Sequence, residues 1–177
     1  MSPESTSNNA RVRFSRLPEA LTADLVELNN DPRVLRHMPL ARGAFTAEGC
    51  ADWVEGKEAN WQLHGYGPVA LYVDDEFAGW CGLQDEDGEA DLALVLRPHF
   101  WGWGGVILAA IVEDPVACPP KINSITAMLP VSRRGSGVMK RWGFSADATI
   151  VVDGVVFERF RMVKTHGRFL LLDGDEH

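Results

Sequence analysis

The stretch from residue 91 to residue 105 constrains the fold more than any other part of the chain. Residues 91–96 read Asp-Leu-Ala-Leu-Val-Leu, residues 101–105 read Trp-Gly-Trp-Gly-Gly, and the apolar run 106–112 follows. The first run predicts a strand buried on both faces, and the last predicts a helix. A helix start has unpaired N–H groups, and glycines let them approach a bulky diphosphate. The pattern therefore predicts an anion site at a strand–helix junction.

Glycines also make simple turns, and by itself this cluster supports a turn as well as it supports a phosphate cradle. The loop has no lysine, which excludes the Gly-x-x-x-x-Gly-Lys-Ser/Thr phosphate loop. It also lacks the full Gly-x-Gly-x-x-Gly fingerprint of dinucleotide-binding domains, and the predicted strands do not alternate regularly with helices. A dinucleotide-binding fold is therefore disfavoured.

The other elements follow from hydrophobic periodicity and turn signals. Helices are expected from residue 18 to about 30, after a Thr46 cap, over 106–112 and from about 133 to 143. Strands are expected at 11–16, 69–73, 77–83, 91–96, 122–129, 148–152 and 155–163. This order predicts one α+β layered domain over residues 11–163, with a mixed, mostly antiparallel sheet of about six to seven strands flanked by helices. Residues 1–10 are expected to be a disordered tail and residues 164–177 a C-terminal tail.

Composition narrows the class of protein. The 177 residues are 46% hydrophobic and carry a net charge of −8, typical of one soluble domain and unfavourable for nucleic acid. Three cysteines are too few for a disulfide framework, and none has metal-ligand spacing. The first ten residues lack an apolar core, and the run 106–112 is too short to span a bilayer. We therefore expect a cytoplasmic protein with no metal, no nucleic-acid partner and no membrane partner.

Several segments resemble one family in the same order along the chain. Residues 90–105 are similar to the fourth strand and acyl-CoA loop of the GNAT superfamily, in the branch that includes the ribosomal-protein N-terminal acetyltransferases. Residues 30–39 (Asn-Asp-Pro and onward) resemble the segment after the first helix of that branch. Arg141-Trp-Gly-Phe144 resembles the end of its last helix, and residues 153–161 its closing hairpin. Together these segments indicate a GNAT-like domain over residues 11–163.

The resemblance implies that acetyl-CoA is the co-substrate. The backbone of one strand segment would pair with the pantetheine arm, and the amides of the next loop would hold the pyrophosphate. The strand residues are Leu94, Val95 and Leu96, and the loop residues are Trp101, Gly102, Trp103, Gly104, Gly105 and Val106. We expect the Trp101 side chain to pack in the core and the Trp103 side chain to be an exposed loop residue.

The start of the last helix departs from the family pattern of Asn followed three residues later by Ser. Alignment from the preceding strand places Arg133 at the Asn position and Ser136 at the Ser position. Alignment from the Gly143-Phe144 end places Ser132 and Gly135 there instead, and both alternatives stay open. Ser132 could also be only the helix N-cap. The arginines at 133 and 134 would either neutralise CoA phosphates or be solvated.

The resemblance also implies catalytic residues. Asp91 matches the acidic position at the start of the fourth strand and is the candidate general base, with an ordinary turn-edge charge as an equal alternative. Many members carry a tyrosine acid on the last helix, but the only tyrosines here are Tyr66 and Tyr72. A Ser hydroxyl, for which Ser136 is the candidate, or water would replace it, or no acid is needed. His37 and Met38 fall in the acceptor-side segment.

The resulting expectation is an acyl-CoA-dependent N-acyltransferase that moves an acetyl group onto a primary amine, a protein N-terminus or a small molecule, by direct attack. The missing tyrosine favours an alternative, an inactive CoA-binding sensor or scaffold. A third hypothesis is an interaction module whose glycines form only a turn. A homodimer is possible because dimers are common in the family. Cys81 is expected to be a buried structural thiol.

Overall fold

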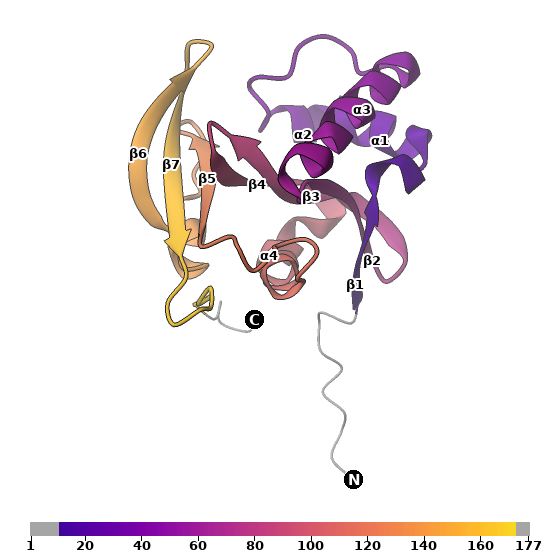
Figure 1. Cartoon of the computed structure of the whole chain (residues 1–177). Helices are drawn as coiled ribbons and strands as arrows, with labels where there is room; N and C mark the ends of the chain where they lie inside the picture. The colour runs from indigo at the N-terminus through magenta and orange to yellow at the C-terminus, as the bar shows by residue number, and fades with distance from the viewer. Residues whose placement is uncertain (1–10, 173–177) are drawn as a thin grey trace.

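In the computed structural model, which describes residues 11–172, seven strands form one sheet in the order β1-β2-β3-β4-β5-β7-β6 (Figure 1). Only β4 and β5 are parallel neighbours; the other pairs are antiparallel. The strands are β1 (Val12–Arg16), β2 (Pro68–Val73), β3 (Glu76–Glu86), β4 (Glu89–Leu96), β5 (Ser124–Pro130), β6 (Ser145–Val152) and β7 (Val155–Val163). The predicted single domain with a mixed, mostly antiparallel sheet is confirmed.

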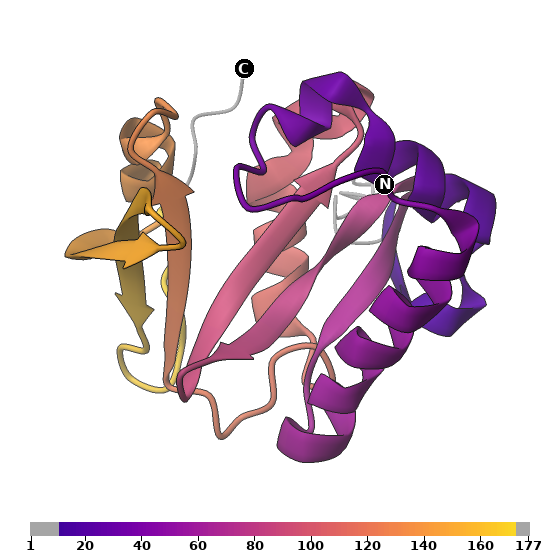
Figure 2. The same cartoon turned by 90° about the horizontal axis from the view of Figure 1, so that it is seen from above.

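Helices cover the sheet on both faces. Three lie over β1–β4 on one face, and α4 packs on the other (Figures 1 and 2). The helices are α1 (Thr22–Asn30), α2 (Pro32–Leu35), α3 (Ala47–His64), α4 (Gly104–Glu113) and α5 (Ser136–Arg141), with 3-10 turns η2 (Leu17–Glu19) and η3 (Pro98–Trp103). No helix within residues 11–172 is long and apolar enough to cross a membrane.

Each face of the sheet has its own hydrophobic core. On the α4 face, Ile107 and Ile111 are fully buried together with Phe160 of β7. On the other face, Leu25 and Leu28 of α1 pack with residues of β2 and β3. Burial of each such side chain stabilises the fold by about 1.5–3 kcal/mol. The two cores fix the helices on opposite faces, and the site lies where the sheet between them opens.

Local signals explain several boundaries. The Thr46 hydroxyl accepts the N–H of Gly49 at 2.9 Å, which confirms the predicted N-cap of α3. The hairpin between β6 and β7 turns at Asp153 and Gly154, with φ of 47° and 78°, as the Asp-Gly signal predicts.

Other boundaries differ from the expectation. Residues 32–35 form a short helix that is not among the expected ones. The Asp31 side chain caps it by accepting the N–H of Arg33. Strand β3 continues to Glu86, past its predicted end at residue 83, and α5 begins at Ser136 rather than near residue 133. The predicted tail 1–10 lies outside the described residues, as do 173–177. Within the predicted C-terminal tail, Phe169 and Leu171 pack against the core.

Candidate functional site

The sheet opens between its two parallel strands. β4 and β5 pair at a single position, Asp91 with Thr126, and beyond it the strands diverge (Figure 2). β4 is paired with β3 along the whole of β4, and β5 is paired with β7 along the whole of β5. Each of the two strands is therefore held in its own half of the sheet. A cavity of about 460 Å³ fills the opening. Within the described chain, the edge of β4 from Leu92 to Leu96 that faces β5 therefore has no strand partner.

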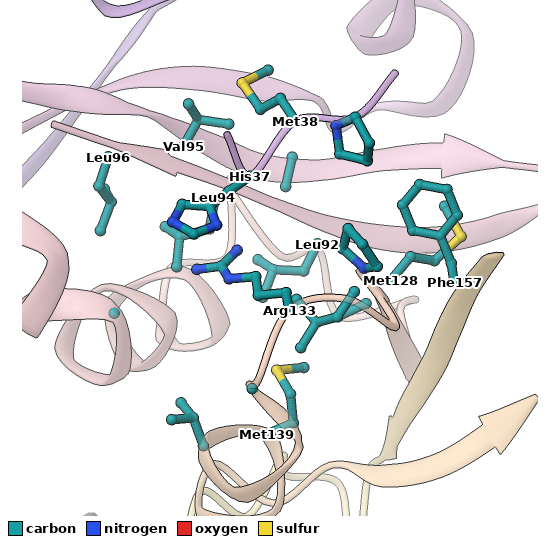
Figure 3. Close-up of a pocket in the computed structure, with 18 of the residues that line it drawn as sticks. His37, Met38, Leu92, Leu94, Val95, Leu96, Met128, Arg133, Met139 and Phe157 are labelled. Carbon is teal, nitrogen blue, oxygen red and sulfur yellow. The ribbon is translucent and has the colours of Figure 1, made fainter. Parts of the chain in front are cut away.

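Strand alternation divides the cavity into two sides. Leu94 and Leu129 point to the α4 face, where they pack against that core. Met128 lies two residues after Thr126 on β5, so it shares the opposite face with Asp91 and Thr126. Phe157 of β7 pairs with Pro130 and lies on the same face as Met128 (Figure 3). Leu94, Val95 and Leu96, predicted on the pantetheine path, all line the cavity. Leu94 and Val95 are only half-buried, because they face it.

The glycine-rich junction lies at the α4 side of the cavity. η3 runs directly into Gly104, and no described side chain caps the start of α4. The first-turn N–H groups can therefore donate hydrogen bonds to an anion, and the helix dipole favours negative charge at this end. A Cβ on Gly102 would meet no atom within 4 Å, so this position leaves open space. Of the predicted loop residues, Trp101 and Gly104 line the cavity, whereas Gly102, Trp103, Gly105 and Val106 do not.

The other two glycines accommodate a residue that the sequence reasoning missed. A Cβ on Gly104 would lie 2.7 Å from the ring of Trp142, and one on Gly105 would lie 3.2 Å from it. Trp142, at the C-terminal end of α5, also lines the cavity. The indole at the end of α5 thus packs against the glycines at the start of α4. Trp142 directly precedes Gly143-Phe144, so an aromatic residue at this position is visible in the sequence. No sequence pattern, however, connects it with Gly104.

The two tryptophans of the junction exchange the roles predicted for them. Trp101, predicted in the core, is 47% exposed, and its indole N–H donates to the carbonyl of Leu96 at 3.0 Å. Trp103, predicted as an exposed loop residue, packs against the core beneath the Arg11 guanidinium. Phe100 is the aromatic side chain that η3 buries. The prediction was wrong because the 3-10 turn, unlike an open loop, directs every third side chain inward.

Asp91 lies at the apex of the opening. Its side chain is 5% exposed, and one carboxylate oxygen accepts the Thr126 hydroxyl at 2.8 Å. Burial raises the pKa of Asp91 to about 7, with a small further rise from Glu86, while the Thr126 hydrogen bond and Arg159 act in the opposite direction. Asp91 does not itself line the cavity, but its cross-strand partner Gln84 does. A carboxyl with this pKa changes protonation near neutral pH, which suits proton transfer.

Basic groups gather at the wide end of the opening. Arg133 and Arg134 line the cavity, and neither makes an ion pair with a described residue. The His37 ring faces the Arg133 guanidinium in Figure 3 and lies 5.6 Å from the Trp101 ring. Burial and the charges of Arg133 and Arg36 lower the pKa of His37. His37 and Met38, predicted on the acceptor side, both line the cavity.

The serines predicted near α5 are not part of the cavity wall. Ser132 and Ser136 are exposed and do not line it, and the residue at the α5 N-cap position is Gly135, so the N-cap role considered for Ser132 is wrong. Cys81, as predicted, is fully buried, and burial raises the pKa of its thiol well above the usual range. Within residues 11–172, no group of His, Cys, Asp and Glu side chains is arranged to hold a metal ion.

Comparison with known proteins identifies the architecture. A family model described as "Acetyltransferase (GNAT) domain" matches residues 11–112. No curated protein matches the sequence. Among solved structures, a probable GNAT-family acetyltransferase from Chromobacterium violaceum has a TM-score of 0.69 at 15% identity, covering 92% of this chain and 93% of that one.

Two further structures have the same fold. The microcin C7 self-immunity acetyltransferase MccE, in complex with acetyl-CoA and AMP, has a TM-score of 0.68 at 14% identity, covering 92% of this chain and 98% of that one. RimL, a ribosomal L7/L12 α-N-protein acetyltransferase, has a TM-score of 0.65 at 18% identity, covering 92% and 93%. At these identities the likeness is one of fold.

Proposed function

The chain belongs to the GNAT acetyltransferase family, whose members use acetyl-CoA, and we propose that it transfers the acetyl group directly to a primary amine, on a protein N-terminus or a small molecule. The observation that carries this proposal is the opening of the sheet beyond the single Asp91–Thr126 pair. A linear acyl-pantetheine arm can pair with the free edge of β4 as an added strand would.

The residues present fit acetyl-CoA as the substrate. The pantetheine arm would lie along Leu94–Leu96, and the pyrophosphate would meet the uncapped start of α4, where Gly102 leaves space. Arg133 and Arg134 supply unpaired positive charge beside this path. Trp142 would bound the site on the α5 side. We propose these groups as the cofactor site, with Arg133 taking part and Ser132 having no role.

The proposed chemistry is one displacement. The amine nitrogen attacks the thioester carbonyl carbon, whose oxygen accepts a hydrogen bond from a free β4 N–H. Before this attack, Asp91 takes the proton of the bound ammonium through a water molecule. The tetrahedral adduct then expels the CoA thiolate, and the thiolate takes the second proton that the nitrogen loses. A thiol has a pKa of about 8.5 and leaves readily, so no tyrosine acid is required. Ser136, exposed and away from the cavity wall, has no part in this scheme.

One observation favours a second function, the CoA-binding sensor. The α5 residues that line the cavity are Val138 and Met139, and neither side chain can donate a proton. Thiol release from acetyl-CoA over a panel of amines, measured beside thermal unfolding with CoA, separates the two. We expect both turnover and a higher melting temperature. Stabilisation without turnover would establish the sensor instead.

A matched pair of arginine variants tests the cofactor site. Arg133→Gln should raise the Kd for CoA about tenfold or more, since a charge-assisted contact is worth about 1.5–3 kcal/mol. Arg42→Gln removes an exposed arginine that does not line the cavity and should leave the Kd unchanged. Isothermal titration calorimetry measures both. Equal Kd values for the two variants would remove Arg133 from the site.

A further inference from the structure

The side of the cavity that carries Asp91 has an apolar wall. Met38 comes from the segment after α2, Met128 from β5 and Phe157 from β7 (Figure 3). Met128 and Phe157 share the sheet face of Asp91, opposite the face on which α4 packs. With a pantetheine arm along β4, as proposed above, the amine would approach the thioester past these three side chains. The two methionines are flexible and polarisable, so they can mould around an apolar group.

The charges around this wall are unsuited to a polycation. Among residues 11–172, the charged or titratable side chains that line the cavity are Arg133, Arg134 and His37, and no carboxylate of this part of the chain lines it. Lys57 adds positive charge near the apex, where its ammonium donates to Gln84 at 2.8 Å.

Two acids on the surrounding strands are already paired, and the charge of Lys57 acts on a third, Glu86 of β3. Glu89 binds Arg161 through two contacts of 2.9 and 3.0 Å. Asp147 binds both Arg159 and Arg161. A chain of ammonium groups, as in a polyamine, would thus meet a cationic lining. Near the apex, Asp91 and Glu86 make no ion pair with a described residue, and Asp91 is needed for proton transfer.

We propose that the acceptor is an α-amine beside an apolar side chain, such as a peptide that begins with Leu, Met or Phe, and that Met38, Met128 and Phe157 bind this side chain. This inference rests on the proposed acetyltransferase function and adds the feature that selects the acceptor.

Proton transfer supports the α-amine. An α-ammonium has a pKa of about 8 and a lysine-type ammonium one of about 10.4. Against the pKa of about 7 for Asp91, transfer is unfavourable by about tenfold for the first and by more than 10³-fold for the second. The groups that face Asp91 and set this balance are Thr126 of β5, Glu86 of β3 and Arg159 of β7.

The test uses tripeptide amides X-Ala-Ala that differ only in their first residue (Leu, Met, Phe, Ser or Asp), with spermidine as the polycation. Thiol release gives kcat/KM for each. We expect the Leu, Met and Phe peptides to exceed the Ser peptide by at least tenfold, because each methylene in an apolar pocket is worth about that factor. Spermidine should be the poorest acceptor, and the Asp peptide should also fall below the Leu, Met and Phe peptides; an Asp peptide that exceeds them would overturn the apolar pocket.

Two methionine variants show which wall makes the selection. Met128→Ala should reduce the Leu/Ser ratio of kcat/KM towards one. Met139→Ala makes the same change on α5, at the cofactor side of the cavity, and should keep the ratio even if it raises KM for acetyl-CoA. Stabilisation of each variant by CoA shows that it is folded.

The outcomes separate this inference from the function on which it rests. Turnover with a preference for spermidine or the Ser peptide overturns the apolar pocket and leaves the acetyltransferase in place. An equal loss of the Leu/Ser ratio in both methionine variants also overturns it. Stabilisation by CoA with no turnover on any acceptor overturns both proposals together.

Discussion

Asp91 shows how burial sets the chemistry of one residue. With a pKa of about 7, the carboxyl is charged only above neutral pH, and the proposed reaction needs the charged form. We expect kcat/KM to fall tenfold for each pH unit below about 7. Asp91→Asn should lower kcat/KM at pH 8 by about 10²–10⁴ while CoA binding persists. A flat pH profile down to pH 5, measured by thiol release, would remove Asp91 as the base.

The same shift has a consequence for stability. The pKa of Asp91 rises from 3.8 in the unfolded chain to about 7 in the fold, so the folded state favours the neutral form. The contribution of Asp91 to the free energy of unfolding is therefore most favourable below pH 4, and this contribution is lost as the pH rises through 7. Asp91→Asn avoids this loss and should gain stability over the natural chain between pH 5 and pH 8, by at most about 4 kcal/mol. Urea unfolding at pH 5 and pH 8 measures the free energy of unfolding of both proteins. If Asp91→Asn differed from the unsubstituted protein by the same amount at both pH values, the raised pKa of Asp91 would be contradicted.

Thr126 is the residue that holds this base in position. Its hydroxyl donates to Asp91 and lowers the pKa of that carboxyl against the effect of burial. Thr126→Val removes the donor with little change of shape, so the midpoint of the pH–rate profile should move to higher pH. Thr126→Ser keeps the hydroxyl and should restore the natural midpoint. If Val and Ser variants share one midpoint, the hydroxyl does not tune Asp91.

At the scale of elements, α4 and α5 meet through an indole and two glycines. Gly104 has no room for a Cβ, which would lie 2.7 Å from the Trp142 ring, whereas Gly102 has open space. Gly104→Ala should cost about 1–3 kcal/mol of stability, the usual effect of overpacking, and should weaken CoA binding. Gly102→Ala makes the same change without a contact and should cost less than 1 kcal/mol.

A second substitution identifies the cause. If the clash with the indole produces the loss, Trp142→Leu in the Gly104→Ala background should recover part of it, since the smaller side chain vacates the space. Urea unfolding of the two single variants and the double variant gives the coupling between the two positions. If the losses of unfolding free energy in the two single variants simply added in the double variant, contact with Trp142 would not be the reason that Gly104 has to be glycine.

The elements that sequence could predict are those whose signals are local. The apolar run of β4, the Thr46 cap and the Asp153-Gly154 turn each depend on neighbouring residues, and each is confirmed. The start of α5 could not be predicted, because residues 130–135 carry competing turn and helix signals and Gly135 takes the N-cap position without a side-chain cap. The exchange of Trp101 and Trp103 also depends on packing across the fold, on Leu96 and Arg11, which no local pattern contains.

For the site, the sequence was enough to propose β4 and the loop over 101–106, but not the apolar wall that contains Met128 and Phe157. Asp91, His37, Met38 and Arg133 could be proposed from the sequence because they fall in segments that resemble the family, and of these His37, Met38 and Arg133 line the cavity. Met128 and Phe157 lie on β5 and β7, 29 residues apart, and they reach the cavity only through the register that pairs Pro130 with Phe157. Contacts set by register between distant strands cannot be read from spacing.

At the scale of the whole molecule, the sheet consists of two halves joined at one strand pair. β1–β4 form one half and β5–β7 the other, and past Asp91 and Thr126 only the cavity separates them. A pantetheine arm along β4 would supply the missing partner and connect the halves. CoA should then stabilise the fold by about 2.7 kcal/mol at 100 times its Kd, which raises the melting temperature by roughly 5–10 °C.

Hydrogen exchange locates this effect. Without CoA, the β4 amides that face β5 between Leu92 and Leu96 should exchange quickly, because no strand accepts their hydrogen bonds. With CoA they should become protected, together with the first-turn amides of α4 from Gly104 onward. Amides in the β6–β7 hairpin are already paired with each other and do not lie on the β4 edge, so their added protection should match only the global gain in stability. Protection spread evenly over the sheet would mean that CoA binds elsewhere, because an arm lying between the halves must act first on the edge that it covers.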